Sequence, residues 1–174
     1  VVDACAGAGG KTLHLAALMK NKGQIIALDI YEWKLAELKR RAKRAGAHNI
    51  ETRFIEDNKV IKRLHEKADR LLIDAPCSGL GVLKRNPDSK WKIDQDFIDR
   101  IKNEQQQILQ DYSKMLKKGG KMVYATCSIL PSENNEQVET FLKNNEGFTL
   151  LKEEKVMPSD GFDGFYMALI QRNA

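Results

Sequence analysis

The sequence has little cysteine and no long apolar run. Its three cysteines, Cys5, Cys77 and Cys127, are odd in number, far apart and never spaced as Cys-x-x-Cys. This pattern disfavours a disulfide framework and a cysteine-rich zinc site, so we expect reduced thiols. No stretch approaches the roughly 20 apolar residues of a membrane span, and the first residues lack the plan of a signal peptide. These absences predict a cytoplasmic protein with no membrane partner.

Histidine is also scarce, and familiar phosphate-binding motifs are missing. A P-loop would need glycine where Cys5 stands, and a strict Gly-x-Gly-x-x-Gly motif starting at Gly7 would need glycine where Thr12 stands. ATP and NAD therefore have little support as ligands. The histidines show no metal-ligand spacing, so we expect helix or surface positions for them and no metal. They are His14, His48 and His65.

The chain is long enough for one hydrophobic core, because 42% of its 174 residues are hydrophobic. It contains no repeat, low-complexity tract or internal linker, which favours a single domain over residues 1–174. Val1-Val2-Asp3 begins inside an apolar run, so we expect an N-terminally truncated fragment of a longer chain.

Short apolar runs alternate with longer helical patterns, which predicts βα units that build a mainly parallel sheet. We expect strands at 1–5, 24–29, 50–55, 70–74, 121–126, 148–151 and 165–170. Helices are expected at 11–20 and 31–45, and again from Pro131 onward. After a long loop at 75–92, an apolar stripe from Phe97 to Met115 predicts a core-facing helix that ends at Gly119-Gly120.

A glycine-rich segment, residues 3–12, lies between the first expected strand and the first expected helix. Glycines there let the backbone approach a ligand closely, which indicates a nucleotide-like cofactor. The second strand ends at Asp29, where an acidic side chain in such folds accepts hydrogen bonds from ribose hydroxyls. The plainer alternatives are a structural turn for the segment and a helix cap for Asp29.

Two further motifs place cysteines at the ends of strands. Asp74-Ala-Pro-Cys77-Ser follows the fourth expected strand, and Ala-Thr-Cys127-Ser follows the fifth. Ligands bind at the carboxyl edge of an open α/β sheet, so we expect two thiols and a carboxylate to meet at one substrate. A thiolate can form a covalent adduct there. A single cysteine is more often a small buried hydrophobe, which is our interpretation of Cys5 unless it forms a wall of the cofactor pocket.

The charge balance suits a polyanionic partner. The chain has 29 Lys and Arg against 24 Asp and Glu, a net charge of +5, which many proteins without such a partner share. More telling is a loop in which basic residues surround a tryptophan, a combination that contacts phosphates and stacks on bases. These residues are Lys84, Arg85, Lys90, Trp91 and Lys92. The alternative is a solvated loop with one half-buried tryptophan.

Four blocks in order resemble one family, the RsmB/NSUN-type RNA cytosine-5 methyltransferases, from Asp3 to about Ile170. The blocks are Asp3-Ala-Cys-Ala-Gly-Ala-Gly-Gly-Lys-Thr12, Asp74-Ala-Pro-Cys-Ser-Gly-Leu-Gly-Val-Leu-Lys-Arg-Asn-Pro-Asp88, Tyr124-Ala-Thr-Cys-Ser128 with Pro131 and Glu133-Asn134, and Asp163-Gly-Phe-Tyr166. The resemblance implies the Rossmann-like α/β fold of class I S-adenosylmethionine-dependent methyltransferases. Its sheet has seven mostly parallel strands in the order 3-2-1-4-5-7-6, an antiparallel last strand and helices on both faces.

The same resemblance implies S-adenosylmethionine as cofactor and RNA, above all ribosomal RNA, as partner. Carbon 5 of cytosine attacks a methyl sulfonium only after a thiolate has added to carbon 6 and made the ring an enamine. The family's nucleophile is the Thr-Cys cysteine, which implies Cys127, while Cys77 assists release of the RNA and Asp74 stabilises the ring. The implied cofactor positions are Cys5, Ala6, Gly7, Ala8, Gly9, Gly10, Lys11, Asp29, Asp57 and Asp74. Asp57 is implied near the adenine, a part that Glu56 could also take.

One departure is Ala8, where the family has proline, and we expect a looser loop there. The alternative functions are a noncatalytic RNA-binding module, transfer RNA as the substrate, and methylation of a small molecule or protein. The paired cysteines argue against a scaffold and against methylation at oxygen or nitrogen, because neither needs a thiol.

Overall fold

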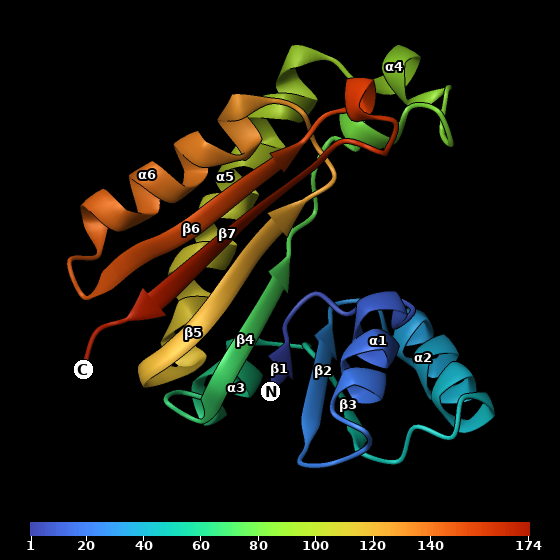
Figure 1. Cartoon of the computed structure of the whole chain (residues 1–174), viewed down its shortest axis with the longest axis vertical. Helices are drawn as coiled ribbons and strands as arrows, with labels where there is room; N and C mark the ends of the chain where they lie inside the picture. The colour runs from blue at the N-terminus through green and yellow to red at the C-terminus, as the bar shows by residue number, and fades with distance from the viewer.

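A twisted sheet runs through the computed structural model, which describes residues 1–174 (Figure 1). Its seven strands are β1 (Val2–Asp3), β2 (Ile25–Asp29), β3 (Ile50–Phe54), β4 (Ala68–Asp74), β5 (Leu116–Thr126), β6 (Phe148–Val156) and β7 (Phe165–Arg172). They are ordered β3-β2-β1-β4-β5-β7-β6. The strands from β3 to β5 pair in parallel, and β7 is antiparallel to both neighbours. The expected strand order and the antiparallel last strand are confirmed.

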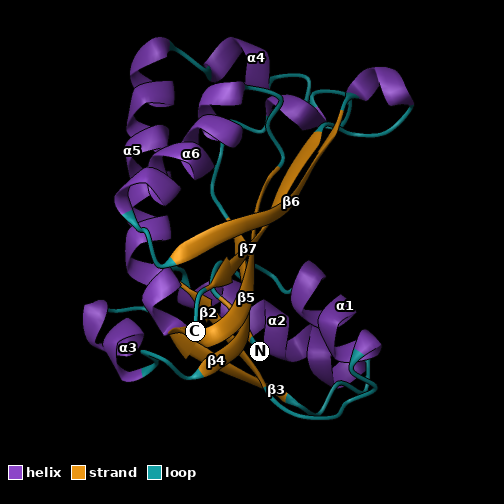
Figure 2. Ribbon diagram, turned by 60° about the vertical axis from the view of Figure 1, so that its left-hand side comes forward, coloured by secondary structure: helices purple, strands orange, loops and turns teal.

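Helices cover both faces of the sheet (Figure 2). One face carries α1 (Gly10–Leu18) and α2 (Glu32–Arg44), and the other carries α3 (Asn58–Arg63), α5 (Gln95–Tyr112) and α6 (Asn135–Asn144). The short helix α4 (Ser89–Lys92) and the 3-10 turns lie in the connections. These turns are η1 (Leu80–Val82), η2 (Ser113–Met115), η3 (Pro131–Glu133) and η4 (Pro158–Asp160). None of the helices is both long and apolar enough to span a bilayer.

The main hydrophobic core lies between the sheet and the face that carries α5 and α6. Tyr124 of β5, Leu109 of α5 and Phe141 of α6 are fully buried in it. A smaller cluster under α2 includes Leu35 and Leu38. Because helices cover both faces, the central parallel strands are apolar on both sides, which explains their continuous apolar runs in the sequence. This packing fixes the strand ends on which the site is built.

The glycine pair after α5 lies in a different element from the one expected. Helix α5 ends at Tyr112, and Leu116 already pairs with Ala68 of β4, so Gly119-Gly120 lies within β5. The register between β4 and β5 shifts at this point, and Gly119 has a φ of +73°, which glycine adopts without strain. The expectation that these glycines end the helix is therefore wrong; they form an irregularity in the strand.

Other differences concern short elements. Helix α3 is not predicted from the sequence, because only Ile61 of its six residues is buried and no apolar stripe results. Pro131 starts a 3-10 turn, and the helix itself begins only at Asn135. The expected first strand is reduced to Val2–Asp3, and β6 continues beyond Leu151 to Val156. The expected loop at 75–92 contains η1 and α4.

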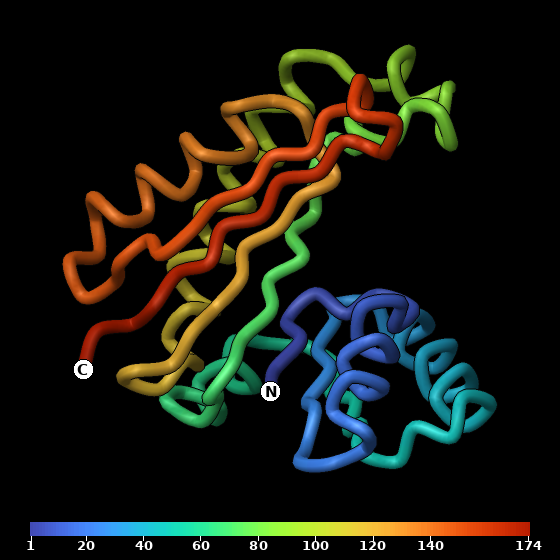
Figure 3. The backbone as a smooth tube through the Cα atoms, in the orientation of Figure 1, coloured from blue at the N-terminus to red at the C-terminus, as the bar shows by residue number.

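The strands that precede the two cysteine motifs end together at one edge of the sheet. In the tube of Figure 3, the chain leaves β4 and β5 side by side at the same edge. Asp74, the last residue of β4, pairs with Ala125 near the end of β5. The segments that follow, with Cys77 and Cys127, therefore begin next to each other.

Candidate active site

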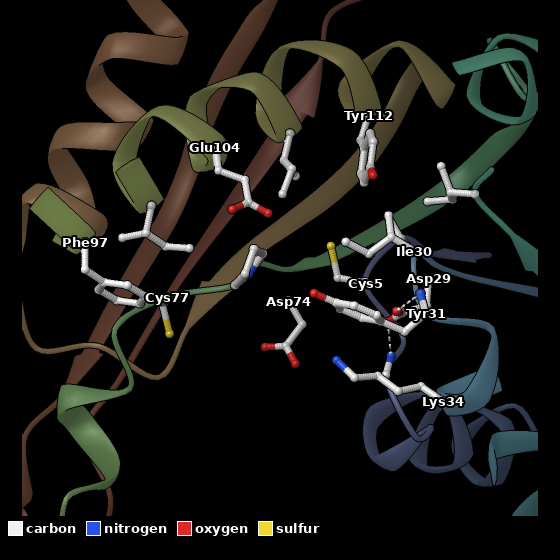
Figure 4. A pocket seen from close by; sticks show the side chains of 16 residues that line it. Cys5, Asp29, Ile30, Tyr31, Lys34, Asp74, Cys77, Phe97, Glu104 and Tyr112 are labelled. Carbon is white, nitrogen blue, oxygen red and sulfur yellow. Dashed lines mark hydrogen bonds between the residues drawn. The ribbon is translucent and has the colours of Figure 1, made fainter. Parts of the chain in front are cut away.

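A cavity of about 430 Å³ opens at the carboxyl edge of the sheet (Figure 4). This volume is within the range of roughly 300–1,000 Å³ that is typical of small-molecule sites. The cavity lies between the ends of β1, β2 and β4 and the face of α5. Its lining residues are Ala4, Cys5, Gly7, Asp29, Ile30, Tyr31, Lys34, Ile55, Asp74, Pro76, Cys77, Phe97, Ile101, Glu104, Ile108 and Tyr112.

Asp29 is fixed in the cavity wall by backbone hydrogen bonds. Its Oδ2 accepts from the N–H of Gly7 at 2.8 Å, and its Oδ1 accepts from the N–H of Tyr31 at 2.8 Å (Figure 4). Gly7 has a φ of +54°, in the region that favours glycine. Each carboxylate oxygen retains a lone pair, so Asp29 can still accept from a ligand hydroxyl. The role of Asp29 as the ribose acceptor stays a prediction, and its position in the cavity wall is compatible with it.

The rest of the glycine loop supports the cavity from behind. Gly9 has a φ of +86°, and a Cβ there would lie 2.5 Å from Leu38 Cγ, so α1 and α2 approach closely. Gly10 begins α1, and Arg41 of α2 donates to the carbonyl of Ala8 at 2.8 Å. Of the predicted cofactor residues at positions 5–11, only those at 5 and 7 line the cavity.

Asp57 is placed differently from Asp29. Its carboxylate caps α3 by accepting from the N–H of Lys59 at 2.8 Å, and it lies outside the lining residues. Glu56 is also outside them, whereas Ile55 contributes an apolar side chain to the cavity. The adenine role of Asp57 stays a prediction, and the geometry favours Ile55 at that position.

The two predicted thiols lie next to each other beyond the other end of the cavity, where Cys77 is a lining residue and Cys127 is not. Cys77 Sγ and Cys127 Sγ are 3.3 Å apart, and both side chains are partly buried. The hydrogen bond from the Cys77 thiol is the main cause that lowers the pKa of Cys127, against the opposing effect of burial. The same bond, together with burial, raises the pKa of Cys77. The two titrations are coupled, and Cys127 is the sulfur that more readily becomes a thiolate.

Asp74 lies between Cys77 and the Asp29 side of the cavity (Figure 4). Its Oδ2 accepts from the amine of Lys11 at 2.6 Å. The same amine lies 5.4 Å from the centre of the Phe165 ring, on β7. Lys11 thus links the glycine loop, the end of β4 and β7. The positive charge of Lys11 lowers the pKa of Cys127, whereas the negative charge of Asp74 raises it.

Close backbone contacts pack the neighbouring loops against Cys127. The N–H of Gly81 donates to the carbonyl of Cys127 at 2.9 Å, and the N–H of Gly164 donates to the carbonyl of Gly81 at 2.7 Å. A Cβ on Gly81 would lie 2.2 Å from the carbonyl oxygen of Gly164. This contact requires glycine and brings together the second and fourth motif blocks.

Several cavity residues are missing from the sequence prediction. Tyr31 and Lys34 come from the start of α2, and Glu104 comes from α5. Phe97, Ile101, Glu104 and Ile108 recur every three or four residues, so one face of α5 lines the cavity. The stripe that predicts a core-facing helix therefore also contributes residues to the cavity. The sequence offered one signal for this: the charged Glu104 falls within the otherwise apolar stripe, which indicates that this part of the helix faces a polar cavity.

Cys5 lines the cavity, yet its chemistry differs from that of the paired thiols. Burial raises the pKa of the Cys5 thiol, and nearby carboxylates, Asp3 first among them, raise it further. Burial also raises the pKa of Asp3 to about 6. An acidic neighbour and a low dielectric keep the Cys5 thiol protonated, so Cys5 is a wall of the cavity and not a nucleophile.

The basic loop presents its tryptophan to solvent. Trp91 of α4 is 81% exposed, so the half-buried alternative is wrong, and the amine of Lys90 lies 4.9 Å from its ring centre. Arg85 pairs with Asp163 at 2.7 Å, and Lys92 lies 3.6 Å from Asp88. Part of the positive charge of the loop is thus engaged with carboxylates. No cluster of three or more His, Cys, Asp or Glu side chains is arranged to hold a metal ion.

Comparisons with known proteins cover nearly the whole chain. A family model described as 16S rRNA methyltransferase RsmB/F matches residues 1–171. The probable ribosomal RNA small subunit methyltransferase B of Bacillus subtilis is 40% identical over 149 residues, 85% of this chain and 33% of the relative. The ribosomal RNA small subunit methyltransferase B of Proteus mirabilis is 37% identical over 175 residues, 99% of this chain and 41% of the relative. The chain thus spans 33% to 41% of the length of these relatives.

Solved structures show the same architecture. NSun6 from Pyrococcus horikoshii, solved with SFG, has a TM-score of 0.88 at 30% identity, over 99% of this chain and 47% of that one. A methyltransferase homolog protein from the same organism has a TM-score of 0.83 at 28% identity, over 99% of this chain and 61% of that one.

Proposed function

The chain belongs to the RsmB/F family of 16S rRNA methyltransferases, and we propose that it transfers a methyl group from S-adenosylmethionine to carbon 5 of cytosine in ribosomal RNA. We infer that residues 1–174 form one catalytic domain and that the reaction takes place in the cytoplasm. The observation that carries the proposal is the pair of thiols 3.3 Å apart, beside Asp74 and the cavity.

The cavity has the chemistry of an S-adenosylmethionine site. The carboxylate of Asp29 can accept hydrogen bonds from the ribose hydroxyls, and Ile30, Tyr31 and Ile55 offer apolar surface to the adenine. The cavity also reaches Cys77, so a cofactor held by Asp29 would extend toward the thiols. When bound there, S-adenosylmethionine supplies an electrophilic methyl group.

Cys127 is the proposed nucleophile. Its thiolate adds to carbon 6 of cytosine, so an S–C6 bond forms and the electron pair of the C5–C6 double bond moves into the ring. Carbon 5 becomes an enamine carbon and would attack the methyl group of bound S-adenosylmethionine. A C5–CH3 bond would form as the S–CH3 bond breaks, and its electron pair would stay on the sulfur of the leaving S-adenosylhomocysteine. The hydrogen bond from Cys77 lowers the pKa of Cys127 and so increases the thiolate fraction near neutral pH.

Cys77 has its proposed role at the end of the reaction. The proton of carbon 5 passes to a base, the C6–S bond breaks, and its electron pair returns to the sulfur of Cys127 while the C5–C6 double bond re-forms. The Cys77 thiol, which holds its proton more tightly, donates a hydrogen bond to the departing thiolate. Release of the methylated RNA is therefore slower without Cys77.

Asp74 is the proposed partner of the cytosine ring. Its Oδ2 is occupied by Lys11, which leaves Oδ1 to accept from the exocyclic amine of the base. A carboxyl group aimed there stabilises the charge that develops when sulfur adds to the ring. Lys11 holds Asp74 in place by a charge-assisted hydrogen bond.

The basic loop is the proposed contact with RNA. Exposed Trp91 can stack on an unpaired base, and Lys84 and Lys90 can contact phosphates. Arg85 and Lys92 would exchange their carboxylate partners for phosphates on binding. The basic loop follows Cys77 along the chain through η1 to α4.

The test is a methylation assay on the full-length protein. Unmodified small-subunit ribosomal RNA is incubated with S-adenosylmethionine carrying an isotopically labelled methyl group, and the nucleosides are separated by mass spectrometry. We expect label in 5-methylcytidine with wild-type protein and none with Cys127→Ala. Transfer RNA is the competing substrate in a parallel reaction. RNA binding without label in any nucleoside would favour a noncatalytic module, and label at oxygen or nitrogen would refute the thiol mechanism.

A further inference from the structure

A buried carboxylate connects the two cysteine loops. Glu133, in η3, is 0% exposed. Its Oε1 accepts from the N–H of Ser78 at 2.7 Å and from Nε2 of Gln105 at 3.1 Å. Its Oε2 accepts from the hydroxyl of Ser78 at 2.5 Å and from the hydroxyl of Ser128. We name Glu133, Ser78, Ser128 and Gln105 the carboxylate clasp.

The clasp holds Cys77 from both sides along the chain. Ser78, which follows Cys77, binds Glu133 through its backbone and through its hydroxyl. Pro76, which precedes Cys77, accepts from Nε2 of Gln105 through its carbonyl at 2.9 Å. Gln105 is fully buried in α5, so the Cys77 loop is tied to a helix of the core as well as to Glu133.

Cys127 is held in the same way. Ser128, which follows it, donates to Glu133 and is 1% exposed. Asn134, next to Glu133, accepts from the hydroxyl of Thr126 at 2.5 Å and donates to the carbonyl of Ser128 at 2.9 Å. The residues on both sides of each thiol are therefore fixed to Glu133 or to its immediate partners.

The chemistry of Glu133 indicates positioning more than stabilisation. Four donor groups on Ser78, Gln105 and Ser128 point at the Glu133 carboxylate, so both of its oxygens act as acceptors. None of the ion pairs of the structure includes it. A buried hydrogen-bond network in which every member is paired holds the groups that it joins in one arrangement. What it provides is a fixed geometry between segments that are far apart in sequence.

We propose that Glu133 is a positioning residue that sets the separation of Cys77 Sγ and Cys127 Sγ through the carboxylate clasp. Its effect on the reaction rests on the proposed function, whereas its effect on the thiol separation does not. The clasp keeps the sulfur of Cys127 within hydrogen-bond distance of the sulfur of Cys77, which itself lines the cavity.

The thiol separation is measured by cross-linking with diamide, a diazene oxidant. The two thiols lose two electrons and two protons and form a disulfide, while diamide is reduced to a hydrazine. The full-length protein carries Cys5→Ser, so that among the cysteines of this chain only the clasped pair reacts, and the Cys77–Cys127 peptide is followed over time by mass spectrometry. Disulfides form only when the sulfurs and Cβ atoms can approach closely, so the rate reports the geometry of the pair.

Three variants separate positioning from simple destabilisation. Glu133→Ala removes every acceptor of the clasp. Glu133→Gln keeps its shape, because the amide oxygen can accept from Ser78 N and Gln105 while the amide nitrogen donates to the two serine hydroxyls. Glu139→Ala is the matched control, an exposed glutamate of α6 whose only hydrogen bond is with Asn135.

We expect Glu133→Ala to lose the fast cross-linking and Glu133→Gln and Glu139→Ala to retain it. In the methylation assay, Glu133→Ala should lower kcat by about 100-fold with KM for RNA unchanged, the size of effect that a misplacement of about 1 Å produces. If Glu133→Ala does not fold, Ser128→Ala removes a single donor, and we expect a partial loss of the cross-linking rate.

Cross-linking of Glu133→Ala at the wild-type rate would overturn the proposal, as would equal losses in Glu133→Gln and Glu133→Ala. A lower melting temperature with unchanged cross-linking and kcat would mean a structural role only. If wild-type protein methylates no RNA, the proposed function fails, and the cross-linking comparison still decides whether Glu133 positions the thiols.

Discussion

Replacing Cys77 with alanine is expected to raise the pKa of Cys127. In the structure, the two sulfurs are 3.3 Å apart, and the hydrogen bond between them is the main cause that lowers the pKa of Cys127. Without this bond, burial and the charge of Asp74 still raise the pKa of Cys127. Among the charged side chains that affect Cys127, only Lys11 lowers it. The thiolate of Cys127 therefore forms only at higher pH in Cys77→Ala.

The size of the change follows from the hydrogen bond that is lost. A hydrogen bond to a charged group contributes about 1.5–3 kcal/mol, and about 1.36 kcal/mol corresponds to one pKa unit. Losing the bond should therefore raise the pKa of Cys127 by about 1 to 2. A thiol is a weak donor and Cys127 is partly exposed, which favours the lower end, an increase of about 1. Cys77→Ser keeps a donor at the same position and should lie between wild type and Cys77→Ala.

The assay is the rate of Cys127 alkylation by iodoacetamide as a function of pH, resolved by mass spectrometry of the peptide that contains Cys127. The rate rises with pH as the thiolate forms, and its midpoint gives the apparent pKa. We expect the midpoint of Cys77→Ala to lie about 1 pH unit above that of wild type. A midpoint that is unchanged, or lower, in Cys77→Ala would show that Cys77 does not stabilise the thiolate.

Three further predictions concern the cofactor, the RNA and the core. Asp29→Ala should weaken S-adenosylmethionine binding by about 10- to 100-fold in calorimetry, because hydrogen bonds to a carboxylate are lost, whereas Asp57→Ala should change it little. A comparable loss of S-adenosylmethionine affinity in Asp57→Ala would support the predicted contact of Asp57 with the adenine. Trp91→Ala should weaken RNA binding by about 1–3 kcal/mol through lost stacking, measured by fluorescence anisotropy. Trp33→Ala is the control, because Trp33 is the other exposed tryptophan and lies on α2, and equal losses of RNA affinity in the two variants would contradict a specific contact of Trp91. Phe141→Ala, which removes a fully buried ring packed 5.0 Å from Phe148, should lower the free energy of unfolding in urea by about 3–5 kcal/mol. A loss no larger than that of the exposed Phe162→Ala would contradict the assigned core.

The fold could be predicted well from the sequence because each of its long elements carries a local pattern. The continuous apolar runs of the parallel strands and the spaced apolar residues of α2 and α5 give clear signals. The strand order came from the family resemblance, since local patterns do not specify which strands pair. Gly119-Gly120 was predicted to end a helix, because glycine after a helical pattern usually does so. In the structure, the pairing of Leu116 with Ala68 begins β5 before these glycines and places them inside the strand.

The site was predictable where its residues lie at strand ends. Asp29, Asp74, Cys77 and Cys127 follow strands that share one edge, so their approach to one another follows from the parallel sheet. The clasp was not predictable in this way, because Glu133 meets Ser78 across 55 residues and only folding brings them together. Glu104 was missed because one face of α5 serves both the core and the cavity.

The central claim, a covalent reaction through Cys127, is tested most directly by trapping the protein–RNA adduct. Full-length wild type, Cys77→Ala and Cys127→Ala are incubated with S-adenosylmethionine and unmodified ribosomal RNA, and the mixtures are run on denaturing gels. We expect Cys77→Ala to accumulate a covalent band, because release is slowed while the nucleophile is intact, and Cys127→Ala to form none. A band in Cys127→Ala that is absent from Cys77→Ala would assign the nucleophile to Cys77 and contradict the account.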